Sequence, residues 1–269
     1  MSTMSTRAFA MAGLLVACFL AASPLQAARI DPTQALEKSD AAIGASTGDH
    51  RLIRSDGTPL RLSELRGRPL VVSLIYTSCS TVCPVSTQTL KSTVAQARQA
   101  LGGSAFEVLT LGFDSRNDTP RRMASFATDH DIAGDPMWHV ATASPAVLEA
   151  LLEEVGFSYS GAAGGFDHVS QTTILDQQGR VYRQVYGDEF PLQVLVEPLK
   201  QLIFGISVTA FTPAALADRL RFICTVYDPK AGRYRLDYTI FFEIGVGTAS
   251  LLLGGWMIVR LWRGSRRPA

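Results

Sequence analysis

This chain of 269 residues lacks a strong net charge, a dense basic cluster in its interior and any apparent internal repeat. Its formal net charge at pH 7 is +1, and only 18% of its residues are charged. Proteins that bind nucleic acid carry a basic patch or stripe that attracts phosphates. The composition therefore argues against nucleic acid as a partner.

Cysteine is also scarce, because the chain has only Cys18, Cys79, Cys83 and Cys224. Cys18 falls within a predicted signal peptide and is discarded with it, which leaves an odd number of thiols. In an exported protein this indicates a thiol that is free or bound to a metal. Cys224 stands alone just before a membrane signal, where metal transfer, an intermolecular disulfide and a plain buried cysteine all remain open.

The first 28 residues are typical of a signal peptide. Arg7 supplies a short positive region, residues 8–22 form an apolar stretch, and Ser23–Ala28 provides a cleavage site with a cut after Ala27 or Ala28. Leu25 and Gln26 are larger than the small residues preferred three positions before such a cut. Leu15–Cys18 also resembles a lipoprotein cleavage box, but the apolar run continues beyond it. Ordinary cleavage is therefore favoured.

A second membrane signal lies near the other end of the chain. Residues 239–259 are almost all apolar and are long enough to span a bilayer, with Glu243 as the only charge. Four arginines follow within residues 260–269, so the positive-inside rule predicts a cytoplasmic tail. We expect a single-pass protein of the inner (cytoplasmic) membrane whose domain faces the periplasm. Glu243 fits an interfacial position better than a functional intramembrane carboxylate.

Between these signals, apolar runs typical of strands alternate with segments of helical spacing. Residues 29–48 predict a linker, and residues 206–238 predict a juxtamembrane extension. We expect strands at 51–54, 70–76, 106–113, 138–141, 172–175 and 181–186. We also expect four helices: one that ends at Gly102, one that begins at Pro120, one that begins at Pro145, and one that covers residues 191–204. A Gly-rich loop, 161–165, precedes the last two strands, which read as a hairpin. The order predicts one three-layer α/β domain over 49–205.

The thiols Cys79 and Cys83 follow the apolar run Leu70–Tyr76 and precede a predicted helix. A helix N-terminus stabilises a thiolate, and residues four apart lie on one face of a helical turn. Such a pair can close a disulfide, clamp a soft metal or serve only as buried structure. Its place after a central strand, where open α/β sheets usually carry their sites, favours function.

Three segments resemble the Sco/SenC family of copper-binding, thioredoxin-fold proteins. Thr77–Pro84 matches its Thr-x-Cys-x-x-x-Cys-Pro motif, and Asp114–Thr119 matches its Asp-x-x-x-Asp-Thr motif. Asp167-His168 matches its Asp-His before the hairpin, in a region of resemblance that covers about residues 45–205. Together and in this order, the three motifs are quite specific.

The resemblance implies a thioredoxin-like domain that binds a copper ion through Cys79, Cys83 and His168. It also implies a metallochaperone role, in which copper comes from an upstream donor and goes to the copper-receiving subunit of cytochrome c oxidase. Two thiolates with an imidazole suit Cu(I), and the imidazole also suits Cu(II). The client oxidase and the oxidation state of the copper stay open.

Other residues are weaker candidates for the site. Asp114 follows a central strand at the sheet edge that carries the thiols, so it is a candidate for a functional role at that site. Asp118 is explained equally well as a helix cap. The remaining candidates are expected to be structural or solvated: His50, His130, His139 and Met137.

A thiol–disulfide oxidoreductase without obligatory metal is the main alternative. Cys79 and Cys83 would then cycle between dithiol and disulfide, and one use of this cycle would be to reduce the copper-binding cysteines of a client. Against general redox catalysis, three residues separate the thiols, where thioredoxin has two, and His168 stands where thioredoxins place a cis-proline. Zinc bound by the same three side chains is a further possibility.

Overall fold

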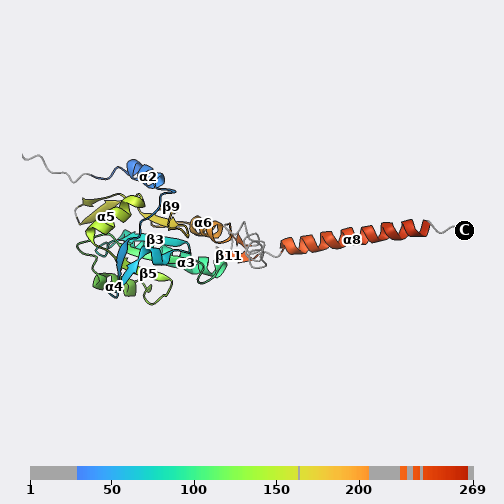
Figure 1. Cartoon of the computed structure of the whole chain (residues 1–269), viewed down its shortest axis with the longest axis horizontal. Helices are drawn as coiled ribbons and strands as arrows, with labels where there is room; N and C mark the ends of the chain where they lie inside the picture. Colours follow the sequence, from blue (N-terminus) through green and yellow to red (C-terminus); the bar gives the residue numbers. More distant parts are fainter. Residues whose placement is uncertain (1–28, 163, 206–224, 229–232, 237–238, 266–269) are drawn as a thin grey trace, which may run out of the picture.

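The structure is a computed structural model that describes residues 29–162, 164–205, 225–228, 233–236 and 239–265 (Figure 1). Its helices are α2 (Pro32–Ala41), the short 3₁₀ helix η1 (Leu62–Leu65), α3 (Val82–Leu101), α4 (Pro120–Asp129), α5 (Pro145–Glu154), α6 (Leu192–Gly205) and α8 (Thr239–Ser265). Its strands are β1 (Arg51–Arg54), β2 (Pro59–Arg61), β3 (Leu70–Ile75), β4 (Glu107–Gly112), β5 (Trp138–Thr142), β6 (Tyr159–Ala162), β7 (Gly165–His168), β8 (Gln171–Leu175), β9 (Val181–Tyr186), β10 (Thr225–Asp228) and β11 (Arg233–Leu236).

One mixed sheet organises the domain, with strand order β2-β1-β5-β4-β3-β8-β9. Strands β3, β4 and β5 are parallel, whereas β8 pairs with β3 antiparallel. Every residue of β3, β4 and β8 is buried, so both faces of the central sheet are covered. The α/β class and the predicted strands and helices of the domain are confirmed.

Local signals in the sequence set the helix boundaries around the central strands. Helix α3 ends at Gly102, as its glycine pair predicts, and packs against α6. Thr119 caps α4 by accepting a hydrogen bond from the Arg122 backbone N–H, and Pro120 occupies the first turn. Helix α4 packs along β5 and so stands beside the end of the sheet that carries the thiols.

The segment expected to be a linker differs from that prediction, because it contains helix α2. Distant side chains hold this helix on the domain: Tyr186 donates to Asp40 at 2.6 Å, and Lys38 pairs with Glu153. At Gly156, with φ of +67°, a Cβ atom would lie 2.7 Å from the Lys38 carbonyl oxygen. Only glycine allows this close approach, so α2 is part of the domain.

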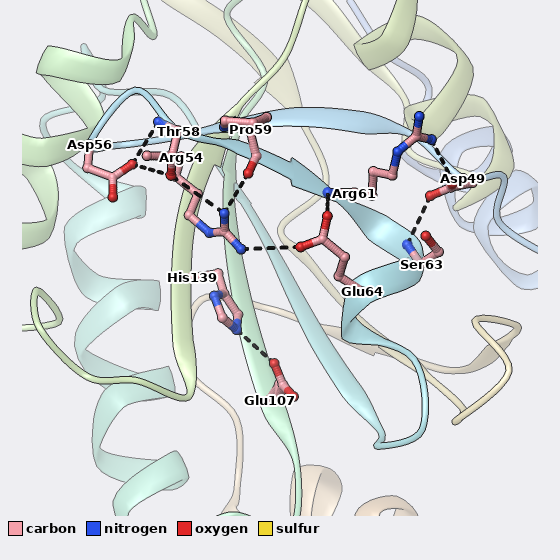
Figure 2. A network of polar contacts seen from close by, with 10 residues as sticks. All are labelled: Asp49, Arg54, Asp56, Thr58, Pro59, Arg61, Ser63, Glu64, Glu107 and His139. Atoms are coloured by element: carbon pink, nitrogen blue, oxygen red, sulfur yellow. Dashed lines mark hydrogen bonds and ion pairs between the residues drawn. The ribbon is translucent and has the colours of Figure 1, made fainter.

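A polar network fastens the β1–β2 edge of the sheet (Figure 2). Arg61 pairs with Asp49 at 2.9 Å, and Arg54 donates to the Pro59 carbonyl oxygen at 2.6 Å. Below them in the figure, His139 on β5 contacts Glu107 on β4 at 2.7 Å. The edge strands are thus held by charge and hydrogen bonding at the surface.

The predicted hairpin is confirmed as β8 and β9, but the Gly-rich segment before it is not a simple loop. It forms a second, separate hairpin from β6 and β7, in which Tyr159 lies opposite His168. At Gly165, a Cβ atom would lie 2.7 Å from the Tyr76 hydroxyl oxygen. The missing side chain allows this hairpin to lie against the end of β3.

Beyond the domain, β10 and β11 pair antiparallel and are followed by α8. Among the residues that the structure describes, no helix combines the length and the apolarity needed to cross a membrane. The predicted signal peptide, 1–28, and Cys224 lie outside the described residues.

Candidate functional site

A buried carboxylate fixes the turn that carries the thiols. Asp118, only 2% exposed, accepts hydrogen bonds from both the backbone N–H and the hydroxyl of Thr77, each at 2.8 Å. Its other oxygen accepts from the Asp114 backbone N–H at 2.9 Å. Burial raises the pKa of Asp118, while the donors from Thr77 and Asp114 act to lower it. The loop after β4 therefore holds the loop after β3 in place.

Cys79 is a half-buried thiol at the N-terminus of α3. Its sulfur accepts a hydrogen bond from the Cys83 backbone N–H at 3.3 Å. Burial acts to raise the pKa of Cys79, but hydrogen bonds from the backbones of Cys83 and Thr81 and from the side chains of Cys83 and Tyr76 lower it to about 7. A large fraction of Cys79 is therefore thiolate at neutral pH, and it can act as nucleophile or soft ligand.

Cys83 has the opposite character, although it lies one turn away. It is 1% exposed and belongs to the hydrophobic core. Burial raises its pKa, and the neighbouring charges of Cys79 and Asp118 raise it further. Both cysteines are free thiols, and their side chains are hydrogen-bonded to each other. The pair consists of an accessible thiolate and a protected, protonated thiol.

His168, at the end of β7, is oriented by its own backbone. Its Nδ1 lies 3.1 Å from the Val169 carbonyl oxygen, which can only accept, so Nδ1 carries the proton. Burial lowers the pKa of His168, against weaker effects of Val169 and Asp167 that raise it. The ring packs against Tyr76, Phe113 and Phe157. A neutral imidazole with a free Nε2 is the form that binds metals.

Cys83 and His168 line the same small cavity, between the start of α3 and the start of β8. Cys79 lines a different hollow, on the side of α4. Within the described parts of the chain, no three His, Cys, Asp or Glu side chains are grouped closely enough to hold a metal ion. The structure thus brings Cys83 close to both predicted partners, through its contact with Cys79 and the cavity it shares with His168.

The two aspartates of the second motif play structural roles. Asp114 is 6% exposed, and its carboxylate accepts from Asn117 Nδ2 at 2.7 Å and from the Arg116 and Asn117 backbones. Asp118 is not the cap of α4, because Thr119 performs that role. The cap interpretation of Asp118 is therefore wrong, and its contact with Thr77 replaces it.

The other predicted candidates lie outside the thiol–imidazole group. His50 contacts Glu154 at 2.6 Å, and His139 contacts Glu107. Half-buried Met137 precedes β5, at the opposite end of the sheet from Cys79. His130 packs against Phe126 at the end of α4, with ring centroids 4.3 Å apart and the ring planes tilted by 48°. Of these, only His130 comes near the thiols, because it lines the hollow beside Cys79.

Sequence reasoning missed Tyr76, which touches every part of this site. It is 7% exposed, hydrogen-bonds to Cys79 through its hydroxyl, and packs against Phe166 and His168. Its position directly before the Thr-x-Cys motif is the only signal that the sequence offers. An aromatic residue ending a buried strand is most simply assigned to the core.

The SCO1/SenC family model matches residues 39–203, more than half of the chain. The chain belongs to the SCO1/SenC family. Among curated proteins, this family member is 26% identical over 80 residues to the SCO1 protein homolog of Bacillus subtilis (strain 168). That match covers 30% of this chain and 40% of the relative.

Solved structures agree on the thioredoxin-like fold of this Sco-family chain. A protein of Aquifex aeolicus VF5, provisionally described as an electron transfer protein, is 29% identical with a TM-score of 0.55. The alignment covers 59% of this chain and 92% of that one. Yeast Sco1, solved with copper bound, is 16% identical with a TM-score of 0.51, over 64% of this chain and 98% of its own.

The contrast between the two thiols predicts selective alkylation. In a Cys224→Ser background, iodoacetamide should modify Cys79 first, because only Cys79 is accessible and ionised. As pH rises, the rate should increase through a midpoint of about 7, which peptide mass spectrometry measures. In the urea-unfolded control both thiols should react alike, with midpoints near the ordinary value of 9.0. Earlier modification of Cys83 in the folded protein contradicts the assignment.

Proposed function

We propose that this chain is a copper-binding protein that delivers copper to, or prepares the thiols of, the binuclear copper site of cytochrome c oxidase. The proposal rests on the position of Cys83. Its backbone N–H donates to the Cys79 sulfur, and its side chain lines a cavity together with His168. Two relatives support it: yeast Sco1 was solved with copper bound, and BsSco is described as a member of the Sco family of cytochrome c oxidase assembly proteins.

The residues present suit copper chemically. Thiolates and imidazole are the donors that Cu(I) and Cu(II) accept, whereas hard cations require oxygen donors. The tautomer of His168 leaves Nε2 free, and Tyr76, Phe113 and Phe157 surround its ring. When bound, copper supplies a thiophilic centre that a partner's own thiols can take over.

Each ligand contributes differently to binding. Cys79 is available as a thiolate at neutral pH, whereas Cys83 must release its proton, because only the thiolate is a good ligand. Copper binding therefore releases a proton and weakens as pH falls. His168, on a hairpin separate from the main sheet, completes the set from the opposite side of Cys83.

Reduction of a client disulfide is a second candidate function, favoured by the unequal pKa values of the two thiols. The Cys79 thiolate attacks a client disulfide and forms a mixed disulfide, releasing one client thiolate. Cys83 loses its proton and attacks the Cys79 sulfur, which releases the second client thiolate and closes Cys79–Cys83. Two electrons pass from this pair to the client.

We also propose that residues 239–259 anchor the protein in the inner membrane, with its domain in the periplasm and its signal peptide, 1–28, removed. The proposal rests on the apolar sequence and the arginines that follow it, since no described helix meets the criterion for a membrane span. Large exposed side chains on α8, including Phe242, Leu251 and Trp256, agree with it. Arg260 stacks over Trp256 at the end next to the basic tail. Tethering donor and client to one membrane raises their effective concentration without a new contact. An upstream donor is expected to supply the copper.

Replacement of His168 tests the ligand set. His168→Ala should weaken copper binding about tenfold or more, or at least 1.4 kcal/mol, and change the sulfur-to-copper charge-transfer spectrum. Competitive titration of the purified protein measures the affinity. His50→Gln serves as the histidine control, because His50 contacts Glu154 away from the thiols. Unchanged affinity and spectrum in His168→Ala would falsify the assignment, and zinc in place of copper after purification would favour the zinc alternative.

Truncation before Thr239 tests the anchor. The shortened protein should keep its copper affinity, because all three ligands lie within the domain, but should support less oxidase assembly in cells. The difference should be largest at low copper, where encounter frequency limits transfer. Loss of copper binding after truncation would contradict this account, because it would show that residues 239–269 contribute to the metal site and are not only an anchor.

A further inference from the structure

The second hollow at the thiol turn has not been assigned a role. It lies between Thr77–Cys79 and helix α4, has a volume of about 360 Å³ and is lined on the helix side by Arg122, Phe126, Asp129 and His130. We refer to it as the α4 groove. Cys79 lines this groove, whereas Cys83 and His168 line the smaller cavity behind it. A molecule in the α4 groove therefore meets the Cys79 side chain and not that of Cys83.

The order of charges on α4 runs against the helix dipole. Its first turn contains Arg121 and Arg122 and no acidic residue, and its last residue is Asp129. Helices are stabilised by the reverse order, with acidic residues first and basic residues last. Throughout the described ranges, no acidic side chain forms an ion pair with Arg121 or Arg122. The first turn of α4 therefore presents positive charge that no acidic side chain of the described residues neutralises.

The fold sets the direction of the groove. Asp118 is bonded to Thr77, so the N-terminal end of α4 lies next to the thiol turn. Arg122 in the first turn is therefore close to the Cys79 end, while Asp129 and His130 lie about 10 Å further along the helix. An extended segment in the groove would meet positive charge near the reactive sulfur and negative charge at the far end.

Attack on a disulfide requires that the client sulfur reach Cys79, with its flanking residues on the surface beside that thiol. We propose that the α4 groove docks the disulfide-bearing segment of a partner protein, and that Arg122 selects a segment with a carboxylate next to its cysteine. This inference rests on the second candidate function, the reduction of a client disulfide by Cys79 and Cys83. Arg122 attracts the segment, while the electrons come only from Cys79 and Cys83, which end as a disulfide.

Two small disulfides separate charge recognition from thiol reactivity. The full chain, reduced and in a Cys224→Ser background, is mixed with dianionic dithiobis(nitrobenzoate) or with neutral dithiodipyridine at low salt. Arg122→Ala should slow reaction with the dianion about fivefold, as expected for the loss of a nearby charge. It should leave the neutral probe unaffected, and Arg122→Lys should restore most of the rate. Arg121→Ala removes the same charge outside the groove and should have a smaller effect.

Disulfide peptides extend the test to the proposed ligand. A peptide with glutamate beside its cysteine should be reduced several-fold faster than the same peptide with glutamine, and Arg122→Ala should abolish that preference. Equal rates for the two peptides with the parent protein would overturn the inference, as would equal effects of Arg121→Ala and Arg122→Ala on the dianion. Copper binding, measured in parallel, should be normal in Arg122→Ala. If the parent itself binds no copper and reduces neither peptide, it is the proposed function that fails.

Discussion

The candidate site depends on the hydrogen bonds of one buried carboxylate, Asp118. By holding both the backbone and the hydroxyl of Thr77, it couples the thiol turn to the loop that begins α4. Each such bond to a charged acceptor contributes about 1.5–3 kcal/mol, and loss of the carboxylate would leave buried donors without a partner. The position of Cys79 at the N-terminus of α3 and the position of the α4 groove beside it both follow from this link.

From that fixed turn, the two sulfurs face different surroundings. Cys79 is half-buried and stabilised as a thiolate by the start of a helix, while Cys83 is enclosed in the core beside the His168 cavity. This arrangement serves both chemistries considered for the site. In the proposed function, copper would be held where Cys83 meets Cys79 and the His168 cavity, and a client sulfur would meet Cys79 where it opens to the surface. Tyr76 links the two sides, because its hydroxyl is hydrogen-bonded to Cys79 and its ring packs against His168.

Much of the domain could be predicted because its signals are local. The runs Leu70–Tyr76 and Phe106–Phe113 predict strands buried on both faces, and Thr119-Pro120 marks the start of a helix. What was missed depends on contacts between distant residues. Helix α2 is held by Tyr186 and Glu153, and the thiol turn by a carboxylate 41 positions away. The unequal pKa values of the cysteines likewise arise from burial, which spacing does not reveal.

The most direct test of the central claim is the X-ray absorption spectrum of the copper-loaded protein at the copper edge. If Cys79, Cys83 and His168 bind copper, the spectrum should show two sulfur neighbours and at least one imidazole around the copper ion. The imidazole signal should be lost in His168→Ala, and one sulfur should be lost in Cys83→Ser. A shell with a single sulfur, or an imidazole that persists without His168, would contradict the assignment of Cys79, Cys83 and His168 as the copper ligands.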